Sequence, residues 1–123
     1  MKETKPFCFS DRIKSVGFAF QGITTFFKTQ HNAWIHAFAA IVTISLGFVL
    51  KLSLNEWCWI VVAIALVFIS EMLNTAIEFL TNLVSPEFHP LAKKVKDVAA
   101  AAVLIAAFTA IVIGITIFLP KII

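Results

Sequence analysis

The 123-residue chain is poor in charge and in glycine, and both shortages exclude classes of protein. Asp, Glu, Lys and Arg make up 14% of the residues and hydrophobic residues 60%, whereas a soluble globular domain has about 25% and about 45–50%. The composition therefore indicates an integral membrane protein with a single domain. With only four glycines, the chain has neither the GxxxxGK loop nor the GxGxxG turn that bind nucleotide phosphates in many soluble domains.

The few cysteines and histidines form no recognisable metal or disulfide pattern. Cys8 and Cys58 lie in different segments without a CxxC pair, so we expect two free thiols. His31 and His36 lack metal-ligand spacing, and we expect them to be structural residues near a membrane interface. His89 lies between two polar segments, where a structural and a functional role are equally favoured.

Hydrophobic periodicity predicts an all-α protein that begins with an amphipathic helix over residues 10–29, capped by Ser10. Apolar residues recur at alternating spacings of three and four, which places them on one helical face. They are Ile13, Val16, Phe20, Ile23 and Phe27. Such a helix can lie in the membrane interface, although packing against other helices explains the stripe equally well.

Three longer apolar runs predict membrane spans over residues 33–50, 57–80 and 98–119. A hydrocarbon core of about 30 Å needs a helix of roughly this length at about 1.5 Å per residue. Ser53 and Glu56 have the spacing of a capping box, in which each side chain accepts from the other residue's backbone N–H. The capping box therefore predicts the start of the second spanning helix.

Prolines predict the boundaries of the last helix. Ser85 followed by Pro86 resembles a cap and a first helical position. The third spanning helix is expected to begin near Pro90 with a basic turn and to end at Pro120. Together with the N-terminal helix, these boundaries give a surface helix and three spans.

Basic residues are distributed unequally between the two sides of the predicted spans. Lys51 and Lys121 fall on one side, and the other eight fall on the opposite side: Lys2, Lys5, Arg12, Lys14, Lys28, Lys93, Lys94 and Lys96. Because cytoplasmic segments carry an excess of Lys and Arg, we expect the N-terminus inside and the C-terminus outside. Since these residues flank apolar runs, the net charge of +3 does not indicate a nucleic-acid partner.

Four polar residues follow one face of the second predicted span. Glu71, Asn74, Glu78 and Asn82 are spaced by three, four and four residues, which places them on one side of a helix. Ionisable groups at membrane depth are costly and are functional candidates by default. With the nearby lysine-rich turn, the stripe suits a metal with phosphates, a proton relay or internal pairing. The structural alternative is an ion pair between Glu78 and Lys96 that fixes the helix register.

The stretch EMLNTAIEFLTN, followed by SPEFHPLAKKVKDVAAAAVLIAA, resembles the signature of the small bacterial membrane lipid kinases. These are the prokaryotic diacylglycerol kinases and the related undecaprenol kinases. Their pattern is a glutamate, Asn-Ser/Thr-Ala, a second glutamate, a short acidic turn, and Lys-Asp at the third span. The loop SPEFHPLAKKVKD is more similar to the undecaprenol-type branch. The resemblance covers nearly the whole chain and implies a homotrimer in the bacterial inner membrane, with cytoplasm-facing active sites shared between neighbours.

The resemblance also implies a reaction and the residues that perform it. An ATP- and Mg²⁺-dependent enzyme would transfer the γ-phosphate to the primary hydroxyl of a membrane lipid. Glu71 matches the general base and Asn74 a residue that positions the carboxylates. Glu78 matches the magnesium ligand, and Lys96 is expected to neutralise phosphate charge. Further nucleotide contacts are expected from Glu87, His89 and Asp97.

Several positions depart from the family pattern and make the site less acidic. Gln30 stands where a second metal-binding glutamate is common, and Asn82 where an aspartate is common. Phe18 replaces a tyrosine that approaches ATP, and a shifted arginine register leaves Arg12 as a candidate nucleotide-binding residue. Gln30 can offer the metal only a neutral carbonyl oxygen. The departures therefore affect metal affinity more than the class of reaction.

Two other functions compete with a lipid kinase. A small transporter or channel subunit would use Glu71 and Glu78 as a proton relay, but residues 58–69 offer no acidic or basic side chain that would continue it. A structural or regulatory membrane subunit would not need the KKVKD turn beside the carboxylates. The sequence therefore favours the kinase, with either diacylglycerol or undecaprenol as the acceptor.

The charge distribution predicts the topology directly. A reporter fused to the C-terminus is expected to be accessible from outside the cell, and one placed before Ser10 is expected to be inaccessible, because eight basic residues hold their segments inside. Labelling of intact and permeabilised cells measures both positions. Two termini on the same side would show that the number of spans is wrong.

Overall fold

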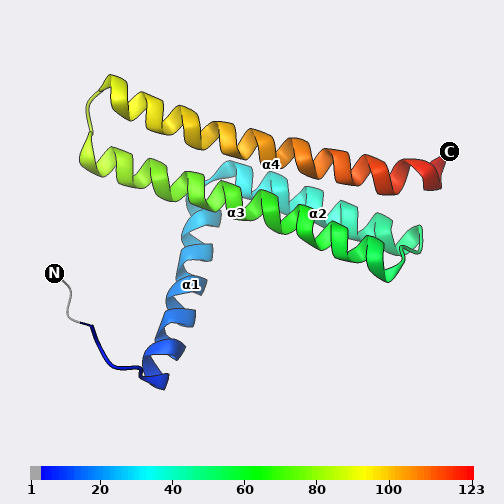
Figure 1. Cartoon of the computed structure of the whole chain (residues 1–123), viewed down its shortest axis with the longest axis horizontal. Coiled ribbons are helices and arrows are strands. Elements are labelled where there is room, and N and C mark those ends of the chain that lie inside the picture. Colours follow the sequence, from blue (N-terminus) through cyan, green and yellow to red (C-terminus); the bar gives the residue numbers. More distant parts are fainter. Residues whose placement is uncertain (1–3) are drawn as a thin grey trace.

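The computed structural model describes residues 4–123, which fold into four helices (Figure 1). They are α1 (Phe9–Thr29), α2 (His31–Val49), α3 (Leu54–Val84) and α4 (Pro90–Ile122). The last three are long and apolar enough to cross a membrane, and the all-α prediction is confirmed. A helix suits lipid because it satisfies its own backbone hydrogen bonds. Lys2, which contributed to the predicted orientation, lies outside the described residues.

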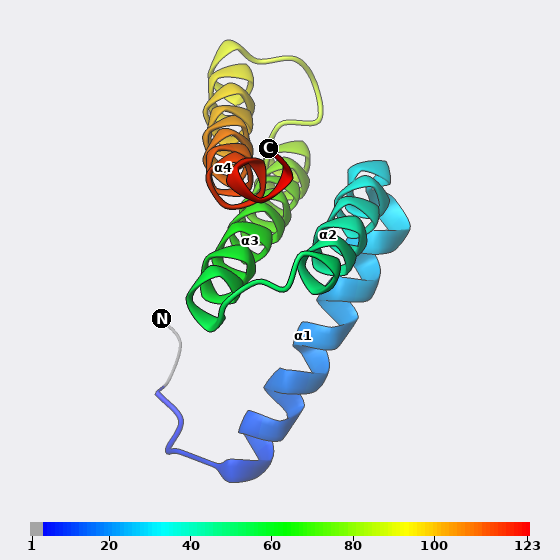
Figure 2. The ribbon, with the colours of Figure 1, turned by 90° about the vertical axis from the view of Figure 1, so that its right-hand side faces the viewer.

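The axes of α2, α3 and α4 are roughly aligned, and the chain reverses direction from each of these helices to the next. Helix α1 meets the start of α2 at a steep angle to all three (Figures 1 and 2). Phe26 is the buried residue of α1. Ile13, Val16 and Phe20 on the predicted apolar stripe are between 56% and 65% exposed. The described part of the chain therefore leaves the N-terminal part of this stripe uncovered.

The first turn of α1 differs from the prediction. The helix begins at Phe9, its N-cap residue is Cys8, and no side chain caps it, so the expected cap by Ser10 is wrong. Ser10 lies two residues after the N-cap position, inside the first turn, and so cannot accept from the first-turn amides as a cap. Its hydroxyl lies 3.0 Å from Cys8 Sγ, and this hydrogen bond lowers the pKa of the exposed Cys8 thiol. Cys8 and Cys58 are both free, as predicted.

An aromatic cluster fixes the junction between α1 and α2. Gln30 is extended between the two helices, and its N–H donates to Phe26 O at 3.0 Å. The indole of Trp34 packs edge-on against Phe27 and donates to Phe27 O at 2.9 Å. Phe68 of α3 packs against both Phe26 and Phe27, with ring centroids 6.4 and 6.3 Å apart. The cluster therefore joins the end of α1 to the middle of α3.

A tight turn joins α2 to α3. Lys51 adopts a left-handed φ of 54°, and Leu52 N donates back to Gly47 O at 3.1 Å, which satisfies carbonyls left free at the helix end. The capping box is confirmed: Glu56 N donates to Ser53 Oγ at 3.2 Å, and Ser53 N donates to Glu56 Oε1 at 2.9 Å. The turn and the cap together make α2 and α3 antiparallel neighbours.

Helices α3 and α4 form a long hairpin, and both extend beyond the predicted spans. Ser85 is the C-cap of α3, so the predicted helix start at Ser85 and Pro86 is wrong. Instead α4 begins at Pro90, as also predicted, because His89 Nδ1 accepts from Leu91 N at 3.0 Å and replaces a missing intrahelical bond. Residues 85–89 between the two helices are not helical.

The far end of α4 also differs from the prediction. Pro120 lies inside the helix, which continues to Ile122, so the expected end at Pro120 is wrong. Lys121 in this last turn pairs with Glu56 of α3, with Nζ and Oε1 3.1 Å apart. One missing N–H in a terminal turn is tolerated when contacts such as this ion pair hold the turn in place.

Packing around Gly47 gives a stability prediction. A Cβ at Gly47 would lie 2.6 Å from Trp57 Cη2 and 3.0 Å from Leu52 Cδ1. Gly47→Ala is therefore expected to lower the free energy of unfolding by about 1–3 kcal/mol, because the indole must move. Gly114→Ala meets nothing within 4 Å and is the control, expected to be neutral or to stabilise by up to about 1 kcal/mol. Unfolding in detergent micelles compares the variants, and an unchanged Gly47→Ala midpoint would contradict this packing.

Candidate active site

The four residues of the polar stripe lie on α3, but they do not form one cluster. Glu71 is buried, with 7% of its surface exposed, and it faces α2. Asn74 and Glu78 are half-buried, and Asn82 is exposed near the end of the helix. The stripe therefore descends from a covered carboxylate to an open polar end beside the first turns of α4.

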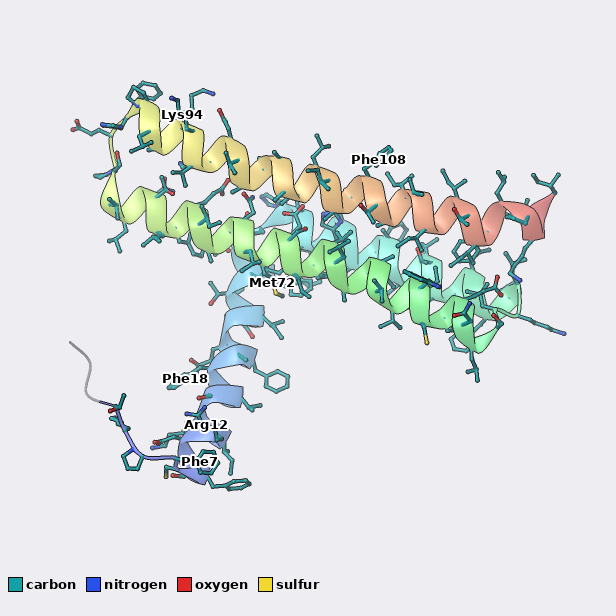
Figure 3. The ribbon with its side chains drawn as sticks, in the orientation of Figure 1. Phe7, Arg12, Phe18, Met72, Lys94 and Phe108 are labelled. Carbon is teal, nitrogen blue, oxygen red and sulfur yellow. The ribbon has the colours of Figure 1, made fainter. Side chains whose placement is uncertain are left out.

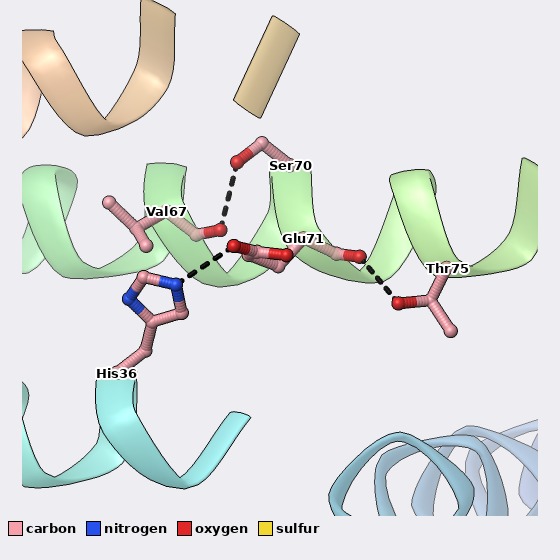
Figure 4. Close-up of polar contacts among 5 residues, drawn as sticks. All are labelled: His36, Val67, Ser70, Glu71 and Thr75. Atoms are coloured by element: carbon pink, nitrogen blue, oxygen red, sulfur yellow. Dashed lines mark hydrogen bonds and ion pairs between the residues drawn. The ribbon is translucent and has the colours of Figure 1, made fainter. Parts of the chain in front are cut away.

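The carboxylate of Glu71 is paired with a histidine of α2. His36 Nε2 and Glu71 Oε1 lie 2.8 Å apart (Figure 4). Because a carboxylate only accepts, the imidazole donates from Nε2. The neighbouring hydroxyls are occupied elsewhere: Thr75 Oγ1 donates to Glu71 O at 2.8 Å, and Ser70 Oγ donates to Val67 O at 2.9 Å. His36 is therefore the only side-chain partner of this carboxylate within residues 4–123.

Asn74 carries a buried oxygen without a hydrogen-bond partner among the described residues. No hydrogen bond joins the Asn74 amide to Glu71 or Glu78 in the described chain, so the expected positioning contact is not seen, although Asn74 lines a pocket between α3 and α4. A buried carbonyl without a donor is costly, so this atom suits a ligand that approaches from outside the chain. Asn74 and Glu78 are one turn apart and together offer two hard oxygen atoms.

The second polar contact joins α3 to α4. Lys96 Nζ donates to Asn82 Oδ1 at 2.7 Å. No ion pair involves Glu78 within residues 4–123, so the alternative of a Glu78–Lys96 pair is wrong for the single chain. Since the Asn82 amide is neutral, the positive charge of Lys96 is not neutralised by its partner. This ammonium remains available to an anion.

The loop between α3 and α4 and the start of α4 hold the remaining nucleotide candidates. Asp97 is paired with Lys93 one turn earlier, with Oδ2 and Nζ 2.6 Å apart and both side chains largely exposed. His89 uses Nδ1 to cap α4. Glu87 is exposed and accepts from Ser85 Oγ through its backbone carbonyl. These side chains lie on the same end of the hairpin as Asn82 and Lys96.

Two candidates on α1 do not reach this end of the hairpin within one chain. Arg12 and Phe18 lie along the part of α1 that points away from α3 (Figure 3). The guanidinium of Arg12 lies 6.0 Å from the ring centroid of Phe7. A nucleotide on the α3–α4 hairpin would therefore not meet Arg12 of the same chain.

The residues predicted to bind magnesium fit that ion only in part. Gln30 lies at the α1–α2 junction, where its amide donates to Thr29 Oγ1 at 3.3 Å. Within the described part of the chain, no three His, Cys, Asp or Glu side chains are placed to hold a metal ion. Magnesium prefers oxygen ligands and needs only one or two from the protein when phosphates supply the rest. Glu78 with Asn74 meets that requirement.

The sequence prediction missed the role of His36, which was expected to be a structural residue. The signal was present, because His36 is the only acidic or basic residue between positions 33 and 50. An ionisable residue within a span needs a partner, and Glu71 was the carboxylate at a comparable depth of the next span. Matching the ionisable residues of neighbouring spans by depth would have predicted the contact between His36 and Glu71.

The site coincides with a region shared with known proteins. The family model described as prokaryotic diacylglycerol kinase matches residues 17–118, which include the α3 stripe and the first turns of α4. The chain belongs to the prokaryotic diacylglycerol kinase family. This membership confirms the resemblance of the EMLNTAIEFLTN stretch, and it gives no support to a proton relay.

The relatives within the prokaryotic diacylglycerol kinase family include enzymes named for two lipids. An undecaprenol kinase of Bacillus subtilis (strain 168) is 44% identical over 108 residues, which are 88% of each chain. A diacylglycerol kinase of Synechocystis sp. is 38% identical over 107 residues, 86% of this chain but 61% of that protein. A diacylglycerol kinase of Escherichia coli (strain K12) is 27% identical over 104 residues, 85% of each. This chain thus spans about three fifths of the Synechocystis protein.

The unneutralised charge of Lys96 generates a prediction about ATP. Lys96→Ala is expected to raise the KM for ATP by about 10-fold or more, because it removes a charge-assisted contact with phosphate. Lys94→Ala is the control: Lys94 is exposed, points outward and makes no ion pair in the described chain (Figure 3). Steady-state kinetics at saturating lipid measures both. A change in the KM for the lipid alone would place Lys96 on the lipid side of the site.

Proposed function

We propose that this protein is a membrane lipid kinase that transfers the γ-phosphate of ATP to the primary hydroxyl of undecaprenol, with diacylglycerol as the alternative acceptor. The observation that carries the proposal is the buried carboxylate of Glu71, held by His36 beside an apolar groove. Membership of the prokaryotic diacylglycerol kinase family supports a lipid kinase. Undecaprenol is favoured because the undecaprenol kinase is 44% identical, compared with 38% and 27% for two diacylglycerol kinases.

The groove suits the chain of a lipid alcohol. It has a volume of about 490 Å³ and is lined by α2, α3 and α4, from His36 at one end to Ile122 at the other. Small residues such as Ala63 and Gly114 leave it open, and His36 and Thr43 are its only polar lining residues. A lipid chain in the groove would extend away from His36, and its hydroxyl would lie beside the His36–Glu71 pair.

Glu71 acts as the general base in the proposed reaction. The hydroxyl proton passes to Glu71 Oε2 as the O–H bond breaks, and the hydroxyl oxygen forms a bond to the γ-phosphorus. The bond between the γ-phosphorus and the bridging oxygen breaks, and its electron pair leaves with ADP. Oε2 is free for this role, because no hydrogen bond engages it within residues 4–123.

The nucleotide occupies the loop end of the α3–α4 hairpin. Lys96 neutralises phosphate charge, and further contacts come from Glu87, His89 and Asp97. Glu78 and Asn74 would hold Mg²⁺, which would neutralise phosphate oxygens, and Gln30 would supply at most a weak neutral ligand. Glu78 lies seven residues beyond Glu71 on α3, about 10 Å along the helix axis, so the lipid and the nucleotide approach the stripe from opposite ends.

The proposed enzyme works as a homotrimer in the bacterial inner membrane, with its nucleotide site facing the cytoplasm. The buried, unpaired Oδ1 of Asn74 and the distance of Arg12 from its own α3 support sites completed by a neighbouring subunit. Alanine-rich helices such as the first half of α4 allow close approach between membrane helices. The Arg12 guanidinium then contacts a nucleotide held by the adjacent chain.

The proposal is tested with purified protein in mixed micelles, with γ-labelled ATP, offered undecaprenol and diacylglycerol in separate reactions. We expect label in undecaprenyl phosphate, at a higher rate than in phosphatidic acid. Label in phosphatidic acid alone would replace the proposed acceptor with diacylglycerol. Label in neither lipid would reject the kinase.

Substitutions of the two glutamates of the stripe are expected to impair different steps of the reaction. Glu71→Gln should lower kcat by at least about 100-fold and leave ATP binding intact, since a base acts in the chemical step. Glu78→Gln should weaken Mg²⁺-dependent ATP binding, since one metal ligand loses its charge. Asp11→Asn makes the same carboxylate-to-amide change on α1, where Asp11 makes no ion pair in the described chain, and is the control. Near-normal lipid phosphorylation by both stripe variants would remove these residues from the site.

A further inference from the structure

His36 makes the one side-chain contact that the Glu71 carboxylate has within residues 4–123. We propose that His36 is a positioning residue: its Nε2–H holds Glu71 Oε1 and thereby aims Oε2 at the lipid hydroxyl. This inference rests on the proposed function, in which Glu71 is the general base. It adds a residue on a different helix to the catalytic stripe of α3.

The contact removes the freedom that a glutamate otherwise has. A glutamate side chain samples many rotamers, and holding it in one of them costs conformational entropy. The 2.8 Å hydrogen bond fixes one carboxylate oxygen, and burial leaves Glu71 7% exposed, so water does not offer alternative partners at the same place. A general base must lie within hydrogen-bond reach of the proton it removes, and a displacement of about 1 Å can cost about 100-fold in rate.

The imidazole is itself held in place by α2 and α3. Its ring packs edge-on against Phe68, with ring centroids 6.3 Å apart, and 24% of its side chain is exposed. Phe68 belongs to the aromatic cluster that joins the end of α1 to α3. His36 also lines the apolar groove, so it borders the proposed lipid site as well as contacting the base.

The same hydrogen bond serves both states of the base. Before transfer, Oε1 of the carboxylate accepts from Nε2–H. After transfer, the proton is on Oε2, and Oε1 is the carbonyl oxygen of a carboxylic acid, which still accepts. The imidazole therefore neither gains nor loses a proton. A side-chain amide of the same reach can replace it, whereas a residue that received the proton could not be replaced in this way.

The experiment compares three replacements of His36 in the full-length enzyme. Gln places an amide N–H where Nε2 lies, Asn carries the same group but is too short, and Leu has no donor. His36→Gln is expected to retain kcat within about 3-fold. His36→Asn and His36→Leu are expected to lower kcat by about 10- to 100-fold, with the KM for ATP and ATP binding unchanged. His31→Leu is the control, because His31 is exposed on the same helix and makes no side-chain hydrogen bond in the described chain.

Two outcomes would overturn the role of His36. If all three variants keep the wild-type kcat, the contact does not position the base. If His36→Gln is as slow as His36→Asn, the ring itself is required and a hydrogen bond is not sufficient. Should His36→Leu fail to fold, the Gln and Asn pair still gives the answer, since both are polar and differ in reach. Turnover by Glu71→Gln would instead reject the proposed function, which makes the two failures distinguishable.

Discussion

A polar group on a membrane helix must find a partner on a neighbouring helix, because lipid offers none and an unpaired group is costly. This constraint explains how the helices of the chain meet. Glu71 on α3 is paired with His36 of α2, and the exposed Asn82 accepts from Lys96 of α4. The polar stripe on α3 thus makes side-chain contacts with both neighbouring helices, α2 and α4. Asn74, which finds no partner within the described chain, marks the face where something else must bind.

Polar contacts near both ends also fix the register of the α3–α4 hairpin. Glu56 pairs with Lys121 at the end of the hairpin opposite the loop, and Asn82 pairs with Lys96 near the loop. A slip of one residue would rotate α4 by about 100° and separate both pairs together. Between them lie apolar contacts such as Ile60 with Ile117, which alone would tolerate sliding. The α3–α4 hairpin therefore has a fixed register, and α2 packs beside it with His36 in contact with Glu71.

Local patterns in the sequence predicted the elements well, and distant partners poorly. The capping box of Ser53 and Glu56 was predictable because both residues act within one turn. The caps at Ser10 and Ser85 were misplaced because a serine before a helix does not determine which of several turns closes first. The helix passes through Pro120 because Glu56, 64 residues earlier, holds its last turn. The partner of Glu71 depends on the crossing of α2 and α3, which periodicity within one helix does not specify.

The unequal lengths of the spanning helices give the Glu71 carboxylate a defined depth. α2 has 19 residues, about 28 Å, whereas α3 has 31 and α4 has 33, about 46 and 50 Å. Only α2 matches a hydrocarbon core of about 30 Å, and His36 lies about 8 Å from its first residue. In a thinner or thicker bilayer the lipid headgroups shift along the axis while Glu71 stays fixed to α2. Hydrophobic mismatch would then change the fraction of lipid hydroxyls that reach the carboxylate, and membrane thickness would act as a regulator of turnover.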